Sequence, residues 1–352
     1  MGLNRLEISA FRCFEYAELE PARGVNLVTG ENASGKTSLL EAIFLLGRGR
    51  SFRTARREQV IREGADRLRA VARLSDGRSV GLEVDRTGWQ ARAGGQTVHQ
   101  LADLASLLPV QVIDPEVHRL VQEGPGERRR YLDWATFHVK PAFLQTWREY
   151  QRALRQRNAA LKSGQPDTVV AVWEDALATS GEQLDRWRAD TVKLLAPAVD
   201  RAANHLLESE VVLEYRSGQP GATGLRAALE EHRNRDRRAG MTQVGPHRAD
   251  LGLSLGGHKA RGWVSRGQQK LLAAALVLGQ AEALAEHWGE RGILLVDDVS
   301  AELDRERCRR LLDLITAAPF QVFVTALARD AVEGLRPAAS FHVEQGRIHP
   351  VI

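Results

Sequence analysis

The segment GENASGKT, residues 30–37, limits the possible folds of this chain more than any other feature. It matches the phosphate-binding pattern GxxxxGK followed by serine or threonine, and it lies between the apolar run VNLVT and the amphipathic stretch KTSLLEAIFLL. A strand, a glycine-rich turn and a helix in this order place backbone amides and a helix N-terminus around a phosphate group. A chance glycine turn before a helix is the less favoured alternative. We therefore predict an α/β fold that binds a nucleotide at this loop.

The residues of this loop have separate predicted roles. Lys36 supplies a mobile positive charge to the phosphates, and Thr37 offers a hydroxyl ligand to magnesium. Backbone amides of the loop and of the helix N-terminus surround the β- and γ-phosphates. The predicted nucleotide contacts are Gly30, Glu31, Asn32, Ala33, Ser34, Gly35, Lys36, Thr37 and Ser38.

Two adjacent carboxylates follow an apolar run late in the chain. ILLVDD, residues 293–298, has the composition of a strand that is buried in a parallel sheet and that emerges beside the phosphates. We expect Asp297 to hold magnesium, directly or through water, and Asp298 to orient or deprotonate the attacking water. Asp298 and Lys36 are thus the predicted catalytic residues. A surface pair of carboxylates that caps the next turn is the alternative.

A third polar segment, SRGQQK at residues 265–270, precedes a long apolar helix. A serine and successive amides at a helix start form an anion-binding site, and the segment resembles the LSGGQ-type signature of ABC ATPases. In that superfamily the signature of one subunit contacts the γ-phosphate held by the loop of the other. The resemblance implies that Ser265 and Gly267 contact the nucleotide of a second copy of the chain, with Gln268 supporting the loop. An ordinary helix N-cap would explain the serine but not the full SxGQ pattern.

The basic residues are almost all arginines, with six lysines among 49, and the net charge is +4 at a pI near 9.3. Planar guanidinium groups suit phosphate contacts, although a solvated basic face is the ordinary meaning of such runs. No aromatic residues alternate with these arginines, so contact with a duplex backbone is favoured over base stacking. The candidate DNA contacts are Arg50, Arg53, Arg56 and Arg57, with Arg128, Arg129 and Arg130 as a second cluster.

Cysteine spacing and hydropathy exclude several other classes of protein. Cys13 and Cys308 are isolated, which indicates neither a disulfide framework nor a zinc site. The longest apolar run, LLAAALVLG at residues 271–279, is too short to cross a bilayer. We expect a cytoplasmic protein that has no membrane partner.

Strand patterns and helix patterns divide the chain into three segments. Residues 1–112 are predicted to form mostly strands around one clear helix, 113–288 a helical lobe that carries the signature, and 289–352 further strands and helices. Pro197 is expected to break or kink the longest helical run. The predicted architecture has mixed sheets around the phosphate-loop helix and a second, mainly helical lobe.

The order of these segments resembles the heads of SMC-type ATPases, a branch of the ABC-type ATPases in which the insertion is a long coiled coil. Here the insertion is too short for a long coiled coil. The chain resembles most the RecF family of DNA replication and repair proteins, over essentially its whole length. The segments that carry this resemblance are LEISAFRCF, GENASGKTSLLEAI, GRGRSFRTA, EGPGERRRYLD, GPHRADL, SRGQQK and LLVDDVSAELD.

The resemblance to the RecF family implies a function that composition and spacing do not. It implies a homodimer that forms with ATP and Mg²⁺, binds double-stranded DNA and single/double-strand junctions, and works with RecR and RecO to help load the RecA recombinase. It also implies that SAELD, residues 300–304, is the D-loop, with Glu302 and Asp304 at the dimer interface. GPHRADL, residues 245–251, is a family marker whose only evident physical role is a tight Gly-Pro turn.

Two positions depart from the wider ABC pattern. Ala326 stands where the switch histidine would follow the last core strand, and Asp298 is one methylene shorter than the usual glutamate. We therefore expect slow, DNA-stimulated hydrolysis of ATP. Gln111 is a candidate sensor glutamine, but an ordinary strand residue is the favoured interpretation.

Two other classes share part of this pattern. The nucleotide-binding subunit of a membrane transporter would have a switch histidine and a compact insertion, and the chain has neither. A small-molecule kinase would share the phosphate loop but would have no use for SxGQQ or SAELD.

Overall fold

The structure is a computed structural model that describes residues 2–219, 221, 224–298 and 303–351. The chain forms two compact units: the first comprises residues 1–117 and 274–352, and the second comprises 118–273. The sequence predicted a helical lobe from 113 to 288, whereas residues 113–117 and 274–288 group with the first unit. None of the described helices has the length and the apolar character needed to cross a membrane.

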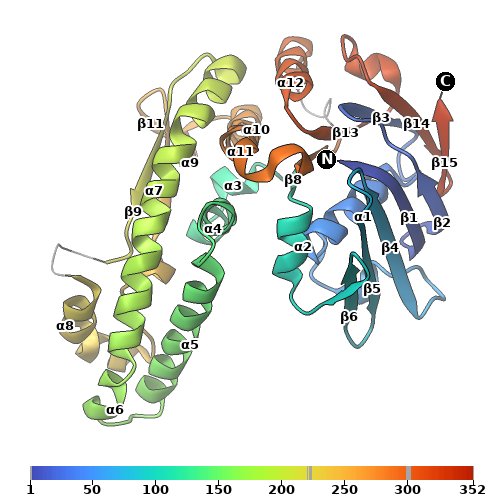
Figure 1. The fold of residues 1–352 in the computed structure, drawn as a ribbon. Helices are drawn as coiled ribbons and strands as arrows, with labels where there is room; N and C mark the ends of the chain where they lie inside the picture. The colour runs from blue at the N-terminus through green and yellow to red at the C-terminus, as the bar shows by residue number, and fades with distance from the viewer. Residues whose placement is uncertain (1, 220, 222–223, 299–302, 352) are drawn as a thin grey trace. The chain divides into compact units, whose positions relative to one another are not determined.

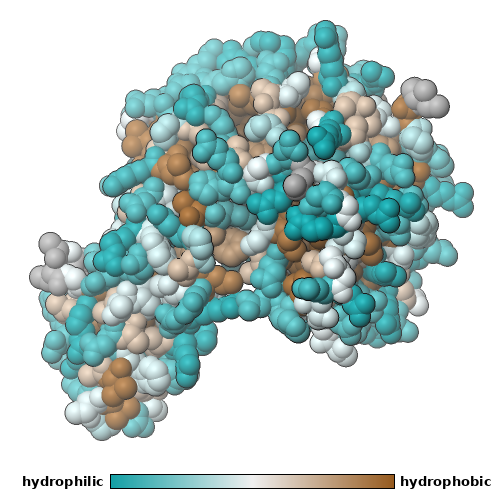
Figure 2. Space-filling view, in the orientation of Figure 1, coloured by the Kyte–Doolittle hydropathy of each residue, from teal (hydrophilic) through white to brown (hydrophobic). Residues whose placement is uncertain are grey.

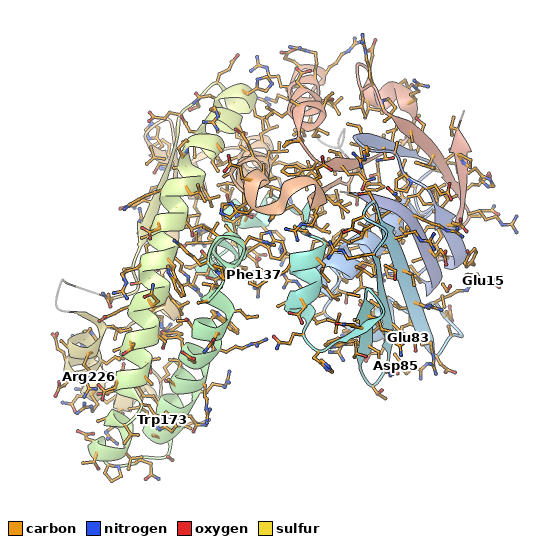
Figure 3. The ribbon with its side chains drawn as sticks, in the orientation of Figure 1. Glu15, Glu83, Asp85, Phe137, Trp173 and Arg226 are labelled. Atoms are coloured by element: carbon orange, nitrogen blue, oxygen red, sulfur yellow. The ribbon has the colours of Figure 1, made fainter. Side chains whose placement is uncertain are left out.

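The first unit contains an antiparallel sheet of six strands in the order β2-β1-β4-β5-β6-β7. Along β5, buried Leu82 and Val84 alternate with Glu83 and Asp85, which point away from the core (Figure 3). This alternation of two is typical of a sheet with one face on the core and one in solvent. Its strands are β1 (Leu3–Phe11), β2 (Phe14–Leu19), β4 (Arg67–Leu74), β5 (Ser79–Asp85), β6 (Trp89–Ala93) and β7 (Gln96–Val98).

A second sheet of six strands, in the order β15-β14-β3-β13-β12-β8, is parallel except for its edge strand β15. Every residue of β12 and β13 is buried, as expected of parallel strands that are covered on both faces. The carboxyl ends of β3, β13 and β12 therefore meet at one edge of the sheet. The strands are β3 (Val25–Thr29), β8 (Val110–Ile113), β12 (Ile293–Val296), β13 (Gln321–Ala326), β14 (Ala339–Glu344) and β15 (Arg347–Val351).

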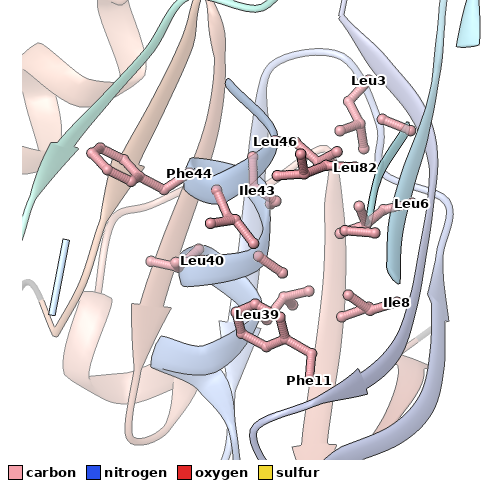
Figure 4. Packing of buried hydrophobic residues seen from close by; sticks show 14 of the residues in the cluster. Leu3, Leu6, Ile8, Phe11, Leu39, Leu40, Ile43, Phe44, Leu46 and Leu82 are labelled. Carbon is pink, nitrogen blue, oxygen red and sulfur yellow. The ribbon is translucent and has the colours of Figure 1, made fainter. Parts of the chain in front are cut away.

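Helix α1 (Lys36–Arg48) shares one hydrophobic core with residues of both sheets. Figure 4 shows Leu39, Ile43 and Leu46 of α1 close to the apolar side chains of β1. A Cβ at Gly47 would lie 2.4 Å from Val110, so the helix packs tightly against β8. This packing fixes the helix behind the phosphate loop. The other helices of this unit include α2 (Leu101–Leu107), α11 (Ala285–Trp288) and α12 (Arg305–Ala317).

The second unit is mainly helical, and its helices α5 and α7 lie side by side (Figure 1). Of the two effects expected of Pro197, a break or a kink, the break does not occur, because helix α7 runs through this residue without ending there. A small antiparallel sheet, β11-β10-β9, completes the unit. Its elements are α3 (Arg119–Gln122), α4 (Pro125–Val139), α5 (Phe143–Lys162), α6 (Asp167–Ala171), α7 (Glu174–Leu207), β9 (Val211–Arg216), α8 (Gly224–Ala239), β10 (Asp250–Leu255), β11 (His258–Lys259) and α9 (Ala260–Trp263), and α10 (Arg266–Ala283) begins within it.

A largely buried ion-pair cluster lies within the second unit. Arg157 of α5 is fully buried and donates to Glu174 of α7 at 3.0 Å and to Asp236 of α8 at 2.6 Å. Arg233 donates to the other oxygen of Glu174 at 2.7 Å. Arg157, Glu174 and Asp236 have no access to solvent and join three helices, whereas the side chain of Arg233 is 16% exposed.

The segment GPHRADL joins α4, α7 and β10 in the same unit. Asp250 accepts hydrogen bonds from Nε and Nη2 of Arg128, at 2.8 and 3.0 Å. Arg129 and Arg188 each donate to a backbone carbonyl of the segment at 2.7 Å. The segment therefore has a structural role beyond a tight turn, and Arg128 and Arg129 serve it rather than a solvated basic face.

Candidate nucleotide-binding site

The phosphate loop between β3 and α1 has a backbone that depends on two glycines. Gly30 has φ 152° and Gly35 has φ 123°, conformations that favour glycine. A Cβ at Gly30 would lie 2.3 Å from the carbonyl oxygen of Val343, and one at Gly35 would lie 2.9 Å from Sγ of Cys13. Only glycine fits both positions, so these residues set the path of the loop.

The N-terminus of α1 has no side-chain cap, because the residue before it is Gly35. The first amides of a helix lack partners within the helix, and here no cap side chain takes their place. Together with the positive end of the helix dipole, they form an anion-binding site. The local geometry therefore agrees with the predicted phosphate contacts of residues 30–38.

The ammonium group of Lys36 lies inside the loop. Its Nζ donates to the carbonyl oxygens of Gly30 at 2.6 Å and Glu31 at 2.8 Å. Partial burial lowers the pKa of Lys36, although Asp298 and Asp297 oppose this change electrostatically. A bound phosphate would favour the charged ammonium, because it adds a negative charge beside this group.

Asp297 joins the end of β12 to the start of α1. Its carboxylate is 6% exposed and accepts hydrogen bonds from Thr37 Oγ1 at 2.9 Å and from Thr325 Oγ1 at 2.7 Å. Burial raises the pKa of Asp297, while the two hydroxyls and the charge of Arg53 oppose that rise. The structure thus brings together the two predicted magnesium ligands.

The atoms at this point suit magnesium. A carboxylate and a hydroxyl are hard oxygen ligands, and magnesium typically takes one or two carboxylates together with substrate phosphates and waters. Among the described residues, no group of three or more histidines, cysteines or carboxylates could hold a metal by itself. A site with one buried carboxylate therefore fits a cation that arrives with a nucleotide.

Asp298 lies directly after the buried carboxylate, and its side chain is exposed. Its backbone N–H donates to Thr325 Oγ1 at 2.8 Å, and its φ is +50°. Its charge opposes the lowering of the Lys36 pKa and adds to the rise in the Asp297 pKa. No sequence pattern predicted a role for Thr325, whose hydroxyl connects the two aspartates.

A second buried carboxylate, Glu41 of α1, organises the loop that follows this helix. It is fully buried and accepts hydrogen bonds from Arg12 at 2.7 and 2.9 Å, from Arg53 at 3.4 Å and from Ser51. Arg53 is exposed, as are the other predicted DNA contacts Arg56 and Arg57, and its charge opposes the rise in the pKa of Asp297. Arg50, the remaining member of that set, is exposed as well.

Gln111 and Ala326 have surroundings that limit their roles. The side chain of Gln111 is 7% exposed, and its Nε2 donates to Gln280 Oε1 at 2.8 Å. This interior contact favours the interpretation of Gln111 as a strand residue. Ala326 is fully buried at the end of β13. An apolar methyl group therefore occupies the position at which the wider ABC pattern has the switch histidine.

The signature segment begins α10 through a reciprocal cap. The backbone N–H of Ser265 donates to Gln268 Oε1 at 2.9 Å, and the N–H of Gln268 donates to Ser265 Oγ at 3.3 Å. This capping box is consistent with the predicted supporting role of Gln268 and also with an ordinary N-cap. Ser265 is exposed and Gly267 is half-buried, so both are accessible. Of the predicted D-loop, Asp304 caps α12 by accepting from the N–H of Arg307, and Glu302 lies outside the described residues.

The chain matches the family model described as the RecF/RecN/SMC N terminal domain over residues 2–349. It is 43% identical over 356 residues to the DNA replication and repair protein RecF of Thioalkalivibrio sulfidiphilus, covering 99% of both chains. It is 41% identical to the protein of the same name from Pseudomonas fluorescens, covering 99% of this chain and 98% of that one.

Solved structures show the same similarity. The recombination mediator protein RecF bound to ATP, in the RecFOR pathway, superposes with a TM-score of 0.88 at 25% identity, covering 99% of this chain and 97% of that chain. An Smc head bound to the C-winged helix domain of ScpA superposes with a TM-score of 0.60 at 14% identity, covering 100% and 97%. The second likeness concerns the fold alone.

Proposed function

The chain belongs to the RecF family of ABC-type ATPases, and from that premise we propose that it is an ATP-dependent DNA-binding protein of replication and recombinational repair. The observation that carries this proposal is the chain of contacts from Thr37 through Asp297 and Thr325 to Asp298. It joins a phosphate loop to the carboxylates that ATP hydrolysis requires. The same role places the protein in the cytoplasm, where the chromosome is.

In this proposal the loop residues 30–38 bind the triphosphate, and Lys36 neutralises charge that develops on it. Thr37 and Asp297 hold Mg²⁺, which when bound would neutralise the phosphate oxygens. Asp298 accepts a hydrogen bond from the attacking water and orients it toward the γ-phosphate. Hydrolysis is slow, because Asp298 has a short side chain and Ala326 offers no imidazole to sense the γ-phosphate.

The signature completes the site from a second copy of the chain. We propose that Ser265 and Gly267 of one copy contact the γ-phosphate held by the loop of the other, while Gln268 holds Ser265 in place through the reciprocal cap. ATP therefore bridges two copies and ADP does not, because ADP lacks the phosphate that both copies bind.

The dimer binds double-stranded DNA and single/double-strand junctions. Arg50, Arg56 and Arg57 are exposed and contact the phosphate backbone, and Arg53 contributes from its position beside Glu41. DNA stimulates the weak ATPase activity, and the protein works with RecR and RecO to help load RecA. A structural relative is described as a recombination mediator in the RecFOR pathway, which supports the choice of RecR and RecO as partners.

Sedimentation velocity with ATP or ADP, with and without duplex DNA, tests the proposal. We expect a dimer in ATP that also co-sediments with duplex, a monomer in ADP, and a monomer for Lys36→Met in either nucleotide. Ser265→Arg should also remain a monomer in ATP, because it changes the signature serine. Ser163→Arg is its control, because Ser163 is an exposed serine elsewhere in the second unit. The proposal fails if ADP supports the dimer as well as ATP does, or if duplex binds equally without nucleotide.

A further inference from the structure

A row of basic side chains follows one face of α5 in the second unit. Arg148, Arg152, Arg155 and Lys162 are all exposed and recur at spacings of four, three and seven residues. At about 100° per residue they occupy an arc of about 80°, and at about 1.5 Å per residue the row is about 21 Å long. We call these four residues the α5 basic stripe.

No described carboxylate forms an ion pair with any member of the α5 basic stripe. The opposite face of the same helix differs, because Arg157 is buried there between Glu174 and Asp236. Glu149 lies beside the stripe, and its carboxylate accepts a hydrogen bond from Gln145. Like charges at these spacings repel one another, so the stripe does not stabilise the isolated helix. Its arrangement is explained by an external polyanion.

The chemistry of the stripe favours nucleic acid over an acidic protein. Stable protein interfaces are centred on apolar or aromatic anchors, and none of the exposed large apolar side chains in the described part of the chain lies on α5. Figure 2 shows hydrophilic residues interspersed with paler and apolar ones over the visible face of this unit. Long cationic side chains in a straight row match the regularly spaced phosphates of a duplex.

We infer that the α5 basic stripe binds the phosphate backbone of double-stranded DNA, which adds a second contact surface to that of Arg50, Arg56 and Arg57. The inference rests on the proposed function, because it assumes that the protein binds duplex. A row of about 21 Å corresponds to about six base pairs at 3.4 Å each. Contact with the backbone makes this binding independent of sequence and sensitive to salt.

Titration of a labelled duplex with protein and ATP, at several salt concentrations, tests the inference. Each lost phosphate contact lowers the log–log salt slope by about 0.9, so Arg152→Gln/Arg155→Gln should be shallower by about 1.8. If the two proteins bind equally at 1 M salt, the same slope difference makes the variant bind about 60-fold more weakly at 0.1 M salt. Arg152→Lys/Arg155→Lys should bind nearly as the parent does, because it keeps both charges.

A matched control lies on α8 of the same unit. Arg235 and Arg238 are exposed and form no ion pair with a described carboxylate, and Arg235 lies one helical turn from Glu231. Arg235→Gln/Arg238→Gln removes the same charge, and its duplex affinity should stay within about twofold of the parent. ATP-dependent dimerisation, measured by sedimentation, should be unchanged in every variant.

Three results would overturn the inference. If Arg152→Gln/Arg155→Gln keeps the parental affinity and salt slope, the stripe does not bind duplex, and an acidic protein becomes the favoured partner. An equal loss in the α8 control would show that only the total charge matters. A loss of duplex binding in Arg152→Lys/Arg155→Lys as large as that in Arg152→Gln/Arg155→Gln, with dimerisation intact in both, would show that the two positive charges are not what the duplex contacts. Failure of the unvaried chain to bind duplex would instead overturn the proposed function as well.

Discussion

Replacing Thr325 with valine tests the link between the two aspartates of the nucleotide site. Thr325 is fully buried at the end of β13. Its hydroxyl donates to Asp297 Oδ1 at 2.7 Å and accepts from the N–H of Asp298 at 2.8 Å. Valine keeps the shape of the side chain and removes both interactions. The backbone and the phosphate loop should therefore stay in place.

The size of the effect follows from the charge of Asp297. A hydrogen bond to a charged group contributes roughly 1.5–3 kcal/mol, and loss of that amount in the transition state slows a reaction about ten- to a hundredfold. The N–H of Asp298 also loses its acceptor, but that residue is exposed and water can replace the hydroxyl. We therefore expect hydrolysis of ATP to fall about ten- to a hundredfold in Thr325→Val, with ATP binding retained.

The pH dependence gives this prediction its direction. Burial already raises the pKa of Asp297, and the Thr325 hydroxyl opposes that rise. Removing the hydroxyl raises the pKa further, so the carboxylate becomes ionised, and able to bind magnesium, only at higher pH. The acid limb of the hydrolysis profile should therefore move to higher pH. At pH values below this limb, hydrolysis should need a higher magnesium concentration than in the parent.

Steady-state hydrolysis measured against pH and magnesium concentration provides the assay. Thr316→Val is the matched control, because Thr316 donates only to the carbonyl of Leu312 within α12. The control should keep the parental profile. A Thr325→Val enzyme with the parental rate, magnesium requirement and pH profile would refute the reasoning.

Three further predictions concern the carboxylates and the buried cluster. Asp298→Asn should bind ATP, lose at least about a hundredfold in hydrolysis in a single-turnover assay, and form a longer-lived dimer on DNA; a parental rate would move the catalytic role to another carboxylate. The pKa of Asp297 is raised in the folded state. The contribution of this residue to the stability of the fold is therefore present at low pH and is lost as pH rises through that pKa. Asp297→Asn without magnesium should therefore melt at a higher temperature than the parent at pH 7, and magnesium with ATP should stabilise only the parent; a lower melting temperature would contradict this. Arg157→Met should destabilise the second unit by roughly 3–5 kcal/mol in urea unfolding, because Asp236 stays buried without its partner, whereas exposed Arg155→Met should change stability by less than about 0.5 kcal/mol.

Local patterns predicted the parts of the fold that depend on neighbouring residues. The strand VNLVT, the glycine loop and the helix after it were predicted at residues 25–46, and the structure has β3 and α1 there. The apolar run before Asp297 is β12, with all four residues buried. Period and turn chemistry suffice for such elements because their causes lie within a few residues.

Interactions between distant residues escaped prediction. Arg128 has the pattern of a solvated basic run, yet its partner Asp250 lies 122 residues away in the sequence. Glu41 has the appearance of an ordinary helix glutamate, and only the fold brings Arg12 and Arg53 to it. Thr325 could be identified only through the pairing of β13 with β12. Side chains whose partners come from other elements need the tertiary structure before they can be interpreted.

In the proposed dimer, each ATP is bound by the loop of one copy and the signature of the other. A mixture of two inactive variants tests this arrangement most directly, because Lys36→Met loses the loop and keeps the signature, whereas Ser265→Arg loses the signature and keeps the loop. Each variant alone should sediment as a monomer in ATP. The mixture should contain a dimer with one intact site, formed by the loop of the Ser265→Arg chain and the signature of the Lys36→Met chain. A mixture that stays monomeric in ATP while the unvaried chain dimerises, or a Ser265→Arg chain that dimerises alone, would contradict the account.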